Sequence, residues 1–374
     1  MAKLPEPVHE HTTAQAIVRW YDKKEEPPRP HLGASEIGKP CDRALWYSFR
    51  WCTAKQFPGR IKRLFNTGHR EEARFIEELR GIGAEIYDRD PDTRQQHRFS
   101  AVEGHFGGSC DAIGRGLPEA PKTWAIIEFK THGDKSFTEL QSKGVEKAKP
   151  EHYAQMQVYM GLAELERALY LACNKNTDEL HSEWIHFDKE TFDALIDRAK
   201  YIIDSNEPPL GISTDPAWYQ CKMCDHAPVC HQDKVPQKNC RTCAFVSPGV
   251  DAAWECGKHN TDSLPFETQI TGCDQHLFIP PLITFAEPID SGDGFVLYQV
   301  KGSETKFANV AKDADREKVH EHFDTEVIAC YTSDELHVAS KDAIDDPNVA
   351  ALKTAFASSS IVATSYIEDD DIPF

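Results

Sequence analysis

The sequence predicts an α/β fold from three observations. Residues 66–83 carry apolar side chains at helical spacing and end in glycine, which indicates an amphipathic helix. Residues 124–132 are a short apolar run rich in β-branched and aromatic residues, typical of a strand, and residues 109–113 are expected to pair with it. After a lysine-bearing loop, a second helix is expected to follow Pro150. This alternation of helix, strand, strand and helix predicts a layered α/β core.

The two predicted strands bring acidic side chains together. Alternate residues of a strand share a face, so Glu128 and Lys130 point one way while Ile127 and Phe129 point towards a core. Pairing of the strands would place Asp111 beside Glu128. Two neighbouring carboxylates are costly unless a cation lies between them, and hard oxygen ligands suit Mg²⁺ or Mn²⁺. The sequence therefore predicts a divalent metal site here.

An aspartate followed by Glu-x-Lys on the next strand resembles the signature of the PD-(D/E)xK nuclease superfamily. The resemblance implies a restriction-endonuclease-like core, a central mixed sheet flanked by helices. It implies that Asp111 and Glu128, with the carbonyl of Phe129, hold a metal that activates water for attack on phosphorus. Lys130 would then position the nucleophile or stabilise the transition state.

Two flanking motifs resemble those of the RecB-type branch. Glu72 lies four residues after Gly68, as in the first motif of phage λ-type and RecB-type exonucleases, and implies a third carboxylate at the metal. Many RecB-type members have a histidine there, and His69 stands directly after the glycine, so Glu72, His69 or both would reach the metal. Gln155 and Tyr159 match the Gln-x3-Tyr motif, which implies DNA contacts or ordering of the active site.

A first set of cysteines suggests a cluster that closes this domain. One early cysteine and a later trio around a RecB-like core resemble the iron–sulfur nucleases of CRISPR adaptation and the AddB nuclease domain. The resemblance implies a 4Fe-4S cluster held by four thiolates. The alternative is zinc bound without the early cysteine. The four residues are Cys41, Cys221, Cys224 and Cys230.

A second set of cysteines predicts a small metal-binding module. Four sulfurs with a Cys-x2-Cys knuckle are typical of a structural zinc site, and a second iron–sulfur cluster is the alternative. His259 and His276 could each replace a cysteine. The four cysteines are Cys240, Cys243, Cys256 and Cys273. The others are expected to be buried thiols: Cys52, Cys110, Cys173 and Cys330.

Charge and hydropathy favour a cytoplasmic DNA-binding protein. No apolar segment is long enough to span a bilayer, and the N-terminus lacks the apolar region of a signal peptide. We therefore expect the protein to be located in the cytoplasm, which would be that of the bacterial host if the protein is phage-encoded. The net charge of −19 opposes nucleic-acid binding, but residues 281–374 contribute 7 Lys or Arg against 19 Asp or Glu. Between Lys39 and Arg70 there are 8 Lys or Arg and 1 Asp among aromatic residues, which suits single-stranded DNA.

Five regions are predicted. They are an N-terminal extension (1–30), a RecB-like nuclease domain (31–235), a four-cysteine metal module (236–280), a small α+β domain (281–360) and an acidic tail (361–374). Within the α+β domain, three strands and two helices, near residues 313–322 and 348–358, are expected. The tail resembles the C-terminal tip of bacterial single-stranded-DNA-binding protein, SSB, which implies docking on SSB-interacting repair and replication proteins. A solubilising tail is the alternative, as is one that folds back on the enzyme's own groove. The docking residues would be Asp369, Asp370, Asp371, Ile372, Pro373 and Phe374.

The predicted function is a metal-dependent DNA exonuclease of phage or bacterial recombination and repair, acting on single strands or duplex ends. The alternative is an inactive DNA-binding adaptor that imitates the SSB tip and recruits or sequesters host repair proteins. Only the enzyme has a reason to keep the full set of Glu72, Asp111, Glu128 and Lys130.

Overall fold

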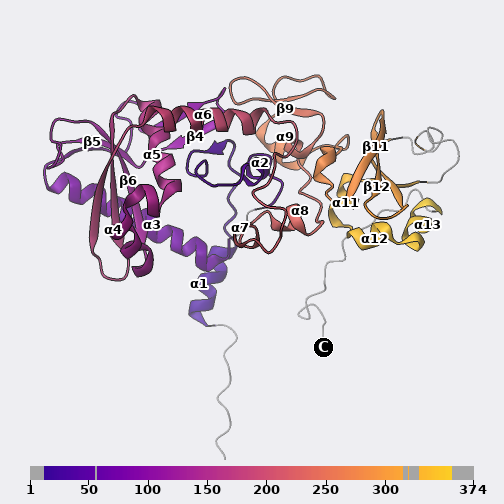
Figure 1. The fold of residues 1–374 in the computed structure, drawn as a ribbon, viewed down its shortest axis with the longest axis horizontal. Helices are drawn as coiled ribbons and strands as arrows, with labels where there is room; N and C mark the ends of the chain where they lie inside the picture. Colours follow the sequence, from indigo (N-terminus) through magenta and orange to yellow (C-terminus); the bar gives the residue numbers. More distant parts are fainter. Residues whose placement is uncertain (1–11, 55–56, 315–318, 320–327, 356–374) are drawn as a thin grey trace, which may run out of the picture. The chain divides into compact units, whose positions relative to one another are not determined.

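The structure is a computed structural model that describes residues 12–54, 57–314, 319 and 328–355 (Figure 1). Most of the helix predicted near residues 313–322 lies outside this part of the chain. So do the predicted SSB-like docking residues, which are Asp369, Asp370, Asp371, Ile372, Pro373 and Phe374. The chain forms two compact units, Met1–Lys39 with Lys55–Lys200, and Pro40–Ala54 with Tyr201–Phe374. In the described part no helix is both long and apolar enough to span a membrane.

The first unit is built on a five-stranded mixed sheet of order β2-β5-β6-β7-β8. Only β6 and β7 run parallel; the other neighbours are antiparallel. A second sheet has the order β1-β4-β3. The strands are β1 (Leu32–Gly33), β2 (Glu85–Tyr87), β3 (Arg98–Ala101), β4 (Phe106–Ser109), β5 (Ala112–Arg115), β6 (Ala125–His132), β7 (Arg167–Asn174) and β8 (Leu180–His186).

Helices cover both faces of the five-stranded sheet. Phe75 of α3 stacks on Phe129 of β6 with ring centroids 5.1 Å apart, and Ile127 joins the same apolar core, so α3 covers the face opposite Glu128. Helix α5 packs against β6 and β7 (Figure 1). The helices of this unit are α1 (Thr13–Asp22), α3 (Gly59–Gly81), α4 (Asp134–Ala148) and α5 (Pro150–Ala163), followed by α6 (Lys189–Asp204), which continues into the second unit.

Two local predictions in this unit were wrong. The helix predicted over residues 66–83 begins at Gly59 and ends at Gly81, and its apolar stripe runs through Phe75 and Leu79, while Ala73 is exposed. The lysine-bearing segment after β6 is helix α4, not a loop. Its apolar residues Phe137, Leu140 and Val145 are buried, and this tertiary burial favours the helix that the many lysines had obscured.

The second unit contains two small sheets and several short helices. Strands β9 (Val246–Pro248) and β10 (Trp254–Cys256) form an antiparallel pair. A four-stranded sheet has the order β11-β12-β13-β14, namely β11 (Ala286–Gly292), β12 (Phe295–Val300), β13 (Lys306–Val310) and β14 (Ala329–Thr332). The helices are α2 (Asp42–Phe49), α7 (Tyr219–Lys222), α8 (Ala227–His231), η1 (Cys240–Thr242), α9 (Phe266–Thr271), η2 (Pro280–Leu282), α11 (Ser333–Val338), α12 (Lys341–Asp345) and α13 (Pro347–Ala355).

The C-terminal strands β12, β13 and β14 lie where the alternating pattern predicted them, and α13 corresponds to the helix predicted at residues 348–358. Their inward side chains form a buried core that includes Tyr298, Phe307 and Tyr331. The boundaries predicted at residues 30, 235, 280 and 360 stay predictions.

Tyr159 of α5 packs closely on strand β4. A Cβ atom at Gly108 would lie 2.5 Å from the hydroxyl oxygen of Tyr159, and the Tyr159 ring lies 5.7 Å from that of Phe99 on β3. The missing side chain at Gly108 therefore lets α5 approach the strand that leads to Asp111.

Replacing Gly108 with alanine should lower the free energy of unfolding by about 1–3 kcal/mol, because the new methyl group meets the Tyr159 hydroxyl. Adding Tyr159→Phe removes that oxygen and should recover most of the loss, as measured by chemical denaturation. A double variant no more stable than Gly108→Ala alone would contradict this packing.

Candidate active site and cysteine clusters

Asp111 and Glu128 come together because of the register of β5 and β6. Ala112 pairs with Ile127, so the residue before β5 lies opposite Glu128. The Oδ2 atom of Asp111 accepts a hydrogen bond of 2.8 Å from the backbone N–H of Phe129. Glu128 is 1% exposed, and its Oε2 atom has no hydrogen-bond partner among the residues that the structure describes. A buried carboxylate oxygen without a partner is costly, and a cation would satisfy it.

Charge and burial shift the pKa values of Asp111 and Lys130. Burial and the neighbouring Glu128 raise the pKa of Asp111 to about 8, although Lys130 and the Phe129 N–H oppose the shift. Lys130 forms an ion pair with Glu128. Burial alone would lower the pKa of Lys130, but Glu128 and Asp111 outweigh it and hold this pKa above its usual value. Lys130 is therefore a fixed cation and not a base at neutral pH.

Glu72 on α3 acts electrostatically on the same site. Its charge contributes to the raised pKa of both Asp111 and Lys130. Nδ1 of His69 lies 3.3 Å from Oε1 of Glu72, and the His69 side chain is 70% exposed. Among the described residues, no group of three carboxylate, histidine or cysteine ligand atoms within 4.8 Å of one another includes Glu72, Asp111 or Glu128. The predicted role of Glu72 or His69 at a metal therefore stays a prediction.

The carbonyl of Phe129 lies on the side of Asp111. The N–H and C=O of one residue in an extended strand point the same way, and the N–H of Phe129 donates to Asp111. Its carbonyl oxygen therefore points towards the side of β6 on which Asp111 lies, and its role as a metal ligand stays a prediction.

Gln155 and Tyr159 form a hydrogen-bonded pair on α5, and their predicted role in DNA contact or active-site order stays a prediction. Both are buried, and Nε2 of Gln155 donates to the Tyr159 hydroxyl at 3.4 Å. Burial and the charge of Glu128 raise the pKa of Tyr159 well above its usual range. Tyr159 thus stays protonated and packs between the acidic site and the β3–β4 hairpin through Phe99.

Sequence analysis missed a buried polar cluster beside the acidic pair. The hydroxyl of Tyr170 hydrogen bonds to Nε2 of His132 at 2.8 Å and to Nδ1 of His152 at 2.9 Å. Burial, with nearby lysines, lowers the pKa of His132 to about 4 and that of His152 to about 3, so both rings are neutral. Tyr170 pairs with Glu128 across β6 and β7. The alternation of Glu128, Lys130 and His132 on β6 was the available signal.

A third group of ligand-type atoms in this unit is already neutralised. Atoms of Glu71, Cys173 and Asp178 lie within 4.8 Å of one another. Both carboxylate oxygens of Asp178 accept hydrogen bonds from Arg74, at 2.7 and 2.9 Å. This guanidinium supplies the charge that a cation would otherwise bring.

The first cysteine set is assembled within the second unit. Cys41 precedes α2, Cys221 lies on α7 and Cys230 on α8. Burial is the largest cause of the raised pKa of both Cys221 and Cys224. The nearby thiols of Cys41 and Cys230 raise both pKa values further. Nη1 of Arg43 lies 3.6 Å from Sγ of Cys230. Four thiols with an adjacent guanidinium suit an anionic thiolate cluster.

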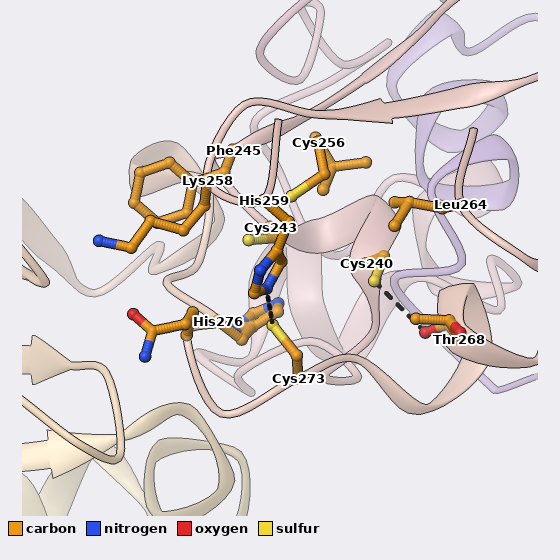
Figure 2. A pocket seen from close by; sticks show the side chains of 12 residues that line it. Cys240, Cys243, Phe245, Cys256, Lys258, His259, Leu264, Thr268, Cys273 and His276 are labelled. Atoms are coloured by element: carbon orange, nitrogen blue, oxygen red, sulfur yellow. Dashed lines mark hydrogen bonds between the residues drawn. The ribbon is translucent and has the colours of Figure 1, made fainter. Parts of the chain in front are cut away.

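The second cysteine set surrounds a cavity of about 70 Å³, also within the second unit (Figure 2). His259 and His276 line the same cavity. Nε2 of His259 lies 3.4 Å from Sγ of Cys273, whereas the buried His276 hydrogen bonds to the Ser333 hydroxyl and to the carbonyl of Asn239. The cysteines are Cys240, Cys243, Cys256 and Cys273. The remaining cysteines are buried as predicted: Cys52, Cys110, Cys173 and Cys330.

Comparisons with known proteins give only remote structural likenesses. No protein-family model matches the chain, and no curated protein matches its sequence. The solved structure of SSO0001 is 17% identical, with 59% of this chain and 96% of that chain covered and a TM-score of 0.36. LHK-Exo, an alkaline exonuclease from Laribacter hongkongensis solved in complex with dAMP, is 13% identical, with 50% and 90% covered and a TM-score of 0.33.

A phage-related exonuclease from Haemophilus somnus 129PT is 18% identical, with 37% of this chain and 69% of that chain covered and a TM-score of 0.27. Likeness at this level assigns neither a family nor an activity to this chain.

The raised pKa of Asp111 predicts a pH-dependent affinity for Mn²⁺. Below a pKa of about 8 the cation must displace a proton from Asp111, so the apparent Kd should fall about tenfold per pH unit between pH 6 and pH 8 and level off above. Without metal, the free energy of unfolding should fall as the pH rises from about 4 to about 8, because the folded state holds the proton of Asp111 more tightly than the unfolded state does.

Isothermal titration of Mn²⁺ between pH 6 and pH 8 measures how the apparent Kd changes with pH. Asp111→Asn is the control, and it should bind Mn²⁺ weakly with a Kd that does not change over this range. An affinity of the unaltered chain that does not change between pH 6 and pH 8 would exclude Asp111 as the titrating ligand.

Proposed function

We propose that this chain is a divalent-metal-dependent deoxyribonuclease. The observation that carries the proposal is the meeting of Asp111, directly before β5, with Glu128 of the adjacent β6, with the ammonium group of Lys130 paired to Glu128. One carboxylate oxygen of Glu128 is buried and unpartnered within the described part of the chain, which is the condition that a bound cation relieves. Acidic ligands and a fixed cation on one strand suit attack of water on a phosphodiester.

Each residue of the site has a separate task in this mechanism. Asp111, Glu128 and the carbonyl of Phe129 would hold Mg²⁺ or Mn²⁺, and Glu72 would act from α3 through an intervening water. When bound, the metal supplies a water of lowered pKa. Lys130 keeps its proton and stabilises negative charge that develops on the phosphoryl oxygens.

The exposed aromatic residues of α1 and the α3 segment suit single-stranded DNA. Trp20, Phe57 and Phe65 are 57%, 39% and 46% exposed, and Phe57 and Phe65 contact each other edge to face. The exposed Arg63 of α3 adds positive charge near them in sequence. Aromatic faces stack with bases and cations contact phosphates, so this surface favours a strand or a frayed end as substrate. We infer exonuclease action on such ends.

The first cysteine set would hold a structural 4Fe-4S cluster. Its four thiols come from two chain segments far apart in the sequence, Cys41 and Cys221 to Cys230. A cluster that joins them closes a long loop, which restricts the unfolded chain. The site fits because all of its donors are sulfur and Arg43 contacts Cys230. The acidic tail ending in Phe374 would dock SSB-interacting repair proteins and takes no part in cleavage.

Removing the acidic pair or its cation should abolish cleavage without unfolding the chain. Asp111→Asn should reduce Mn²⁺-dependent cleavage by at least about 10³-fold through loss of a metal ligand. Lys130→Met should reduce it by about 10²–10³-fold through loss of one charge-stabilising group. Release of nucleotides from 5′- and 3′-labelled single-stranded and duplex DNA measures both rate and direction.

The matched control is Asp193→Asn, which neutralises an exposed aspartate of α6 that pairs only with Lys189 among the ion pairs found in the described residues. Its rate should equal that of the unaltered chain. Cleavage retained by Asp111→Asn, with circular dichroism unchanged, would exclude Asp111 from the reaction. Absence of Mn²⁺-dependent cleavage by the folded, unaltered chain would favour the inactive DNA-binding adaptor instead.

A further inference from the structure

A cavity inside the second unit is surrounded by four cysteines from three segments. Cys240 begins η1, Cys243 follows it, Cys256 ends β10 and Cys273 follows α9. Figure 2 shows their sulfur atoms around one hollow, with the ring of His259 beside Cys273. The cavity has a volume of about 70 Å³. Thiols gathered from three segments around a cavity form a ligand set for metal.

The separation of the sulfur atoms does not fit a single zinc ion. Tetrahedral zinc with Zn–S bonds of about 2.3 Å holds its four sulfurs about 3.8 Å apart. Among the described residues, the only three ligand-type atoms within 4.8 Å of one another belong to Glu71, Cys173 and Asp178. No three of the four cysteine sulfurs are therefore that close. In a cubane each thiolate binds a different iron, which keeps the sulfurs farther apart.

The volume and the lining of the cavity lead to the same conclusion. A water molecule needs about 10–15 Å³ of such space, so about 70 Å³ accommodates several heavy atoms. Phe245, Val246 and Leu264 supply apolar walls, which give a group of water molecules few hydrogen-bond partners. A compact inorganic cluster with sulfur ligands suits a space of this size and chemistry.

We propose that this cavity binds a 4Fe-4S cluster through Cys240, Cys243, Cys256 and Cys273, in place of the zinc ion that the spacing of the sequence favours. The four thiols lose their protons on binding, and each thiolate ligates one iron. This site is separate from the acidic pair and from the first cysteine set, so its test does not depend on nuclease activity.

Buried positive charge beside the cavity suits a cluster with four thiolates. Arg50 and Arg241 are each 1% exposed. Arg241 directly follows Cys240, and Nη1 of Arg50 donates at 3.0 Å to the carbonyl of Val246, which lines the cavity. An anionic cluster would stabilise the buried guanidinium of Arg50, which contacts the wall of the cavity.

His259 would tune the cluster from its exposed side. Its Nε2 atom lies 3.4 Å from Sγ of the half-buried Cys273. A hydrogen bond to a ligating sulfur raises the reduction potential of an iron–sulfur cluster. His259→Ala should therefore retain its iron and shift the potential to a more negative value.

The test is metal analysis of the full chain purified without oxygen. In Cys221→Ser/Cys224→Ser, which disrupts the first set, about four iron atoms and four sulfides per chain should remain, with no stoichiometric zinc. In Cys243→Ser/Cys256→Ser, the iron content should fall by about four atoms relative to the unaltered chain. Cys330→Ser, which removes a buried thiol outside both sets, is the matched control and should change neither content.

Either double variant decides the question if the other fails to fold. One zinc ion per chain and no iron in Cys221→Ser/Cys224→Ser would overturn the proposal. Loss of zinc with unchanged iron in Cys243→Ser/Cys256→Ser would do the same. A first-set variant that contains neither metal, or that contains an organic molecule in the cavity, would also overturn it.

Discussion

The arrangement of the first unit depends on two carboxylates held side by side in a mostly buried place. Asp111 and Glu128 face each other because β5 and β6 pair in one register, and a shift by one residue would turn Glu128 into the apolar core. The backbone N–H of Phe129 and the ammonium of Lys130 offset part of the repulsion. One oxygen of Glu128 still lacks a partner in the described part of the chain. This deficit is what a divalent cation would relieve, so the cost in stability and the proposed chemistry have one origin.

The elements around this pair hold it in place. Helix α3 packs Phe75 against Phe129 on one face of β6, which fixes the strand that carries Glu128 and Lys130. Helix α5 packs Tyr159 against Gly108 on the other side, next to the segment that carries Asp111. The neutral cluster around Tyr170 fills the space behind Glu128 without adding charge. Packing on both faces leaves the acidic pair little freedom to separate.

Within the second unit, cysteines take over part of the role of an apolar core. The module around β9 and β10 is small, and it encloses a cavity instead of closing on apolar side chains. A bound cluster would cross-link the three segments that carry Cys240 and Cys243, Cys256, and Cys273, as metals do in small domains. The buried Arg50 fits this view, because thiolates in the cavity would stabilise its charge.

The sequence by itself determined the local features: the strand that carries Glu128 and Lys130, the helices that contain Phe75 and Tyr159, and the burial of Cys110. Such features follow from the periodicity and chemistry of neighbouring residues. Only the tertiary structure decided the partnership of Tyr170 with two histidines, the helix made by the lysine-rich segment and the spacing of the second cysteine set around its cavity. These depend on how distant segments pack, because burial and charge act through space and leave no periodic signal along the chain.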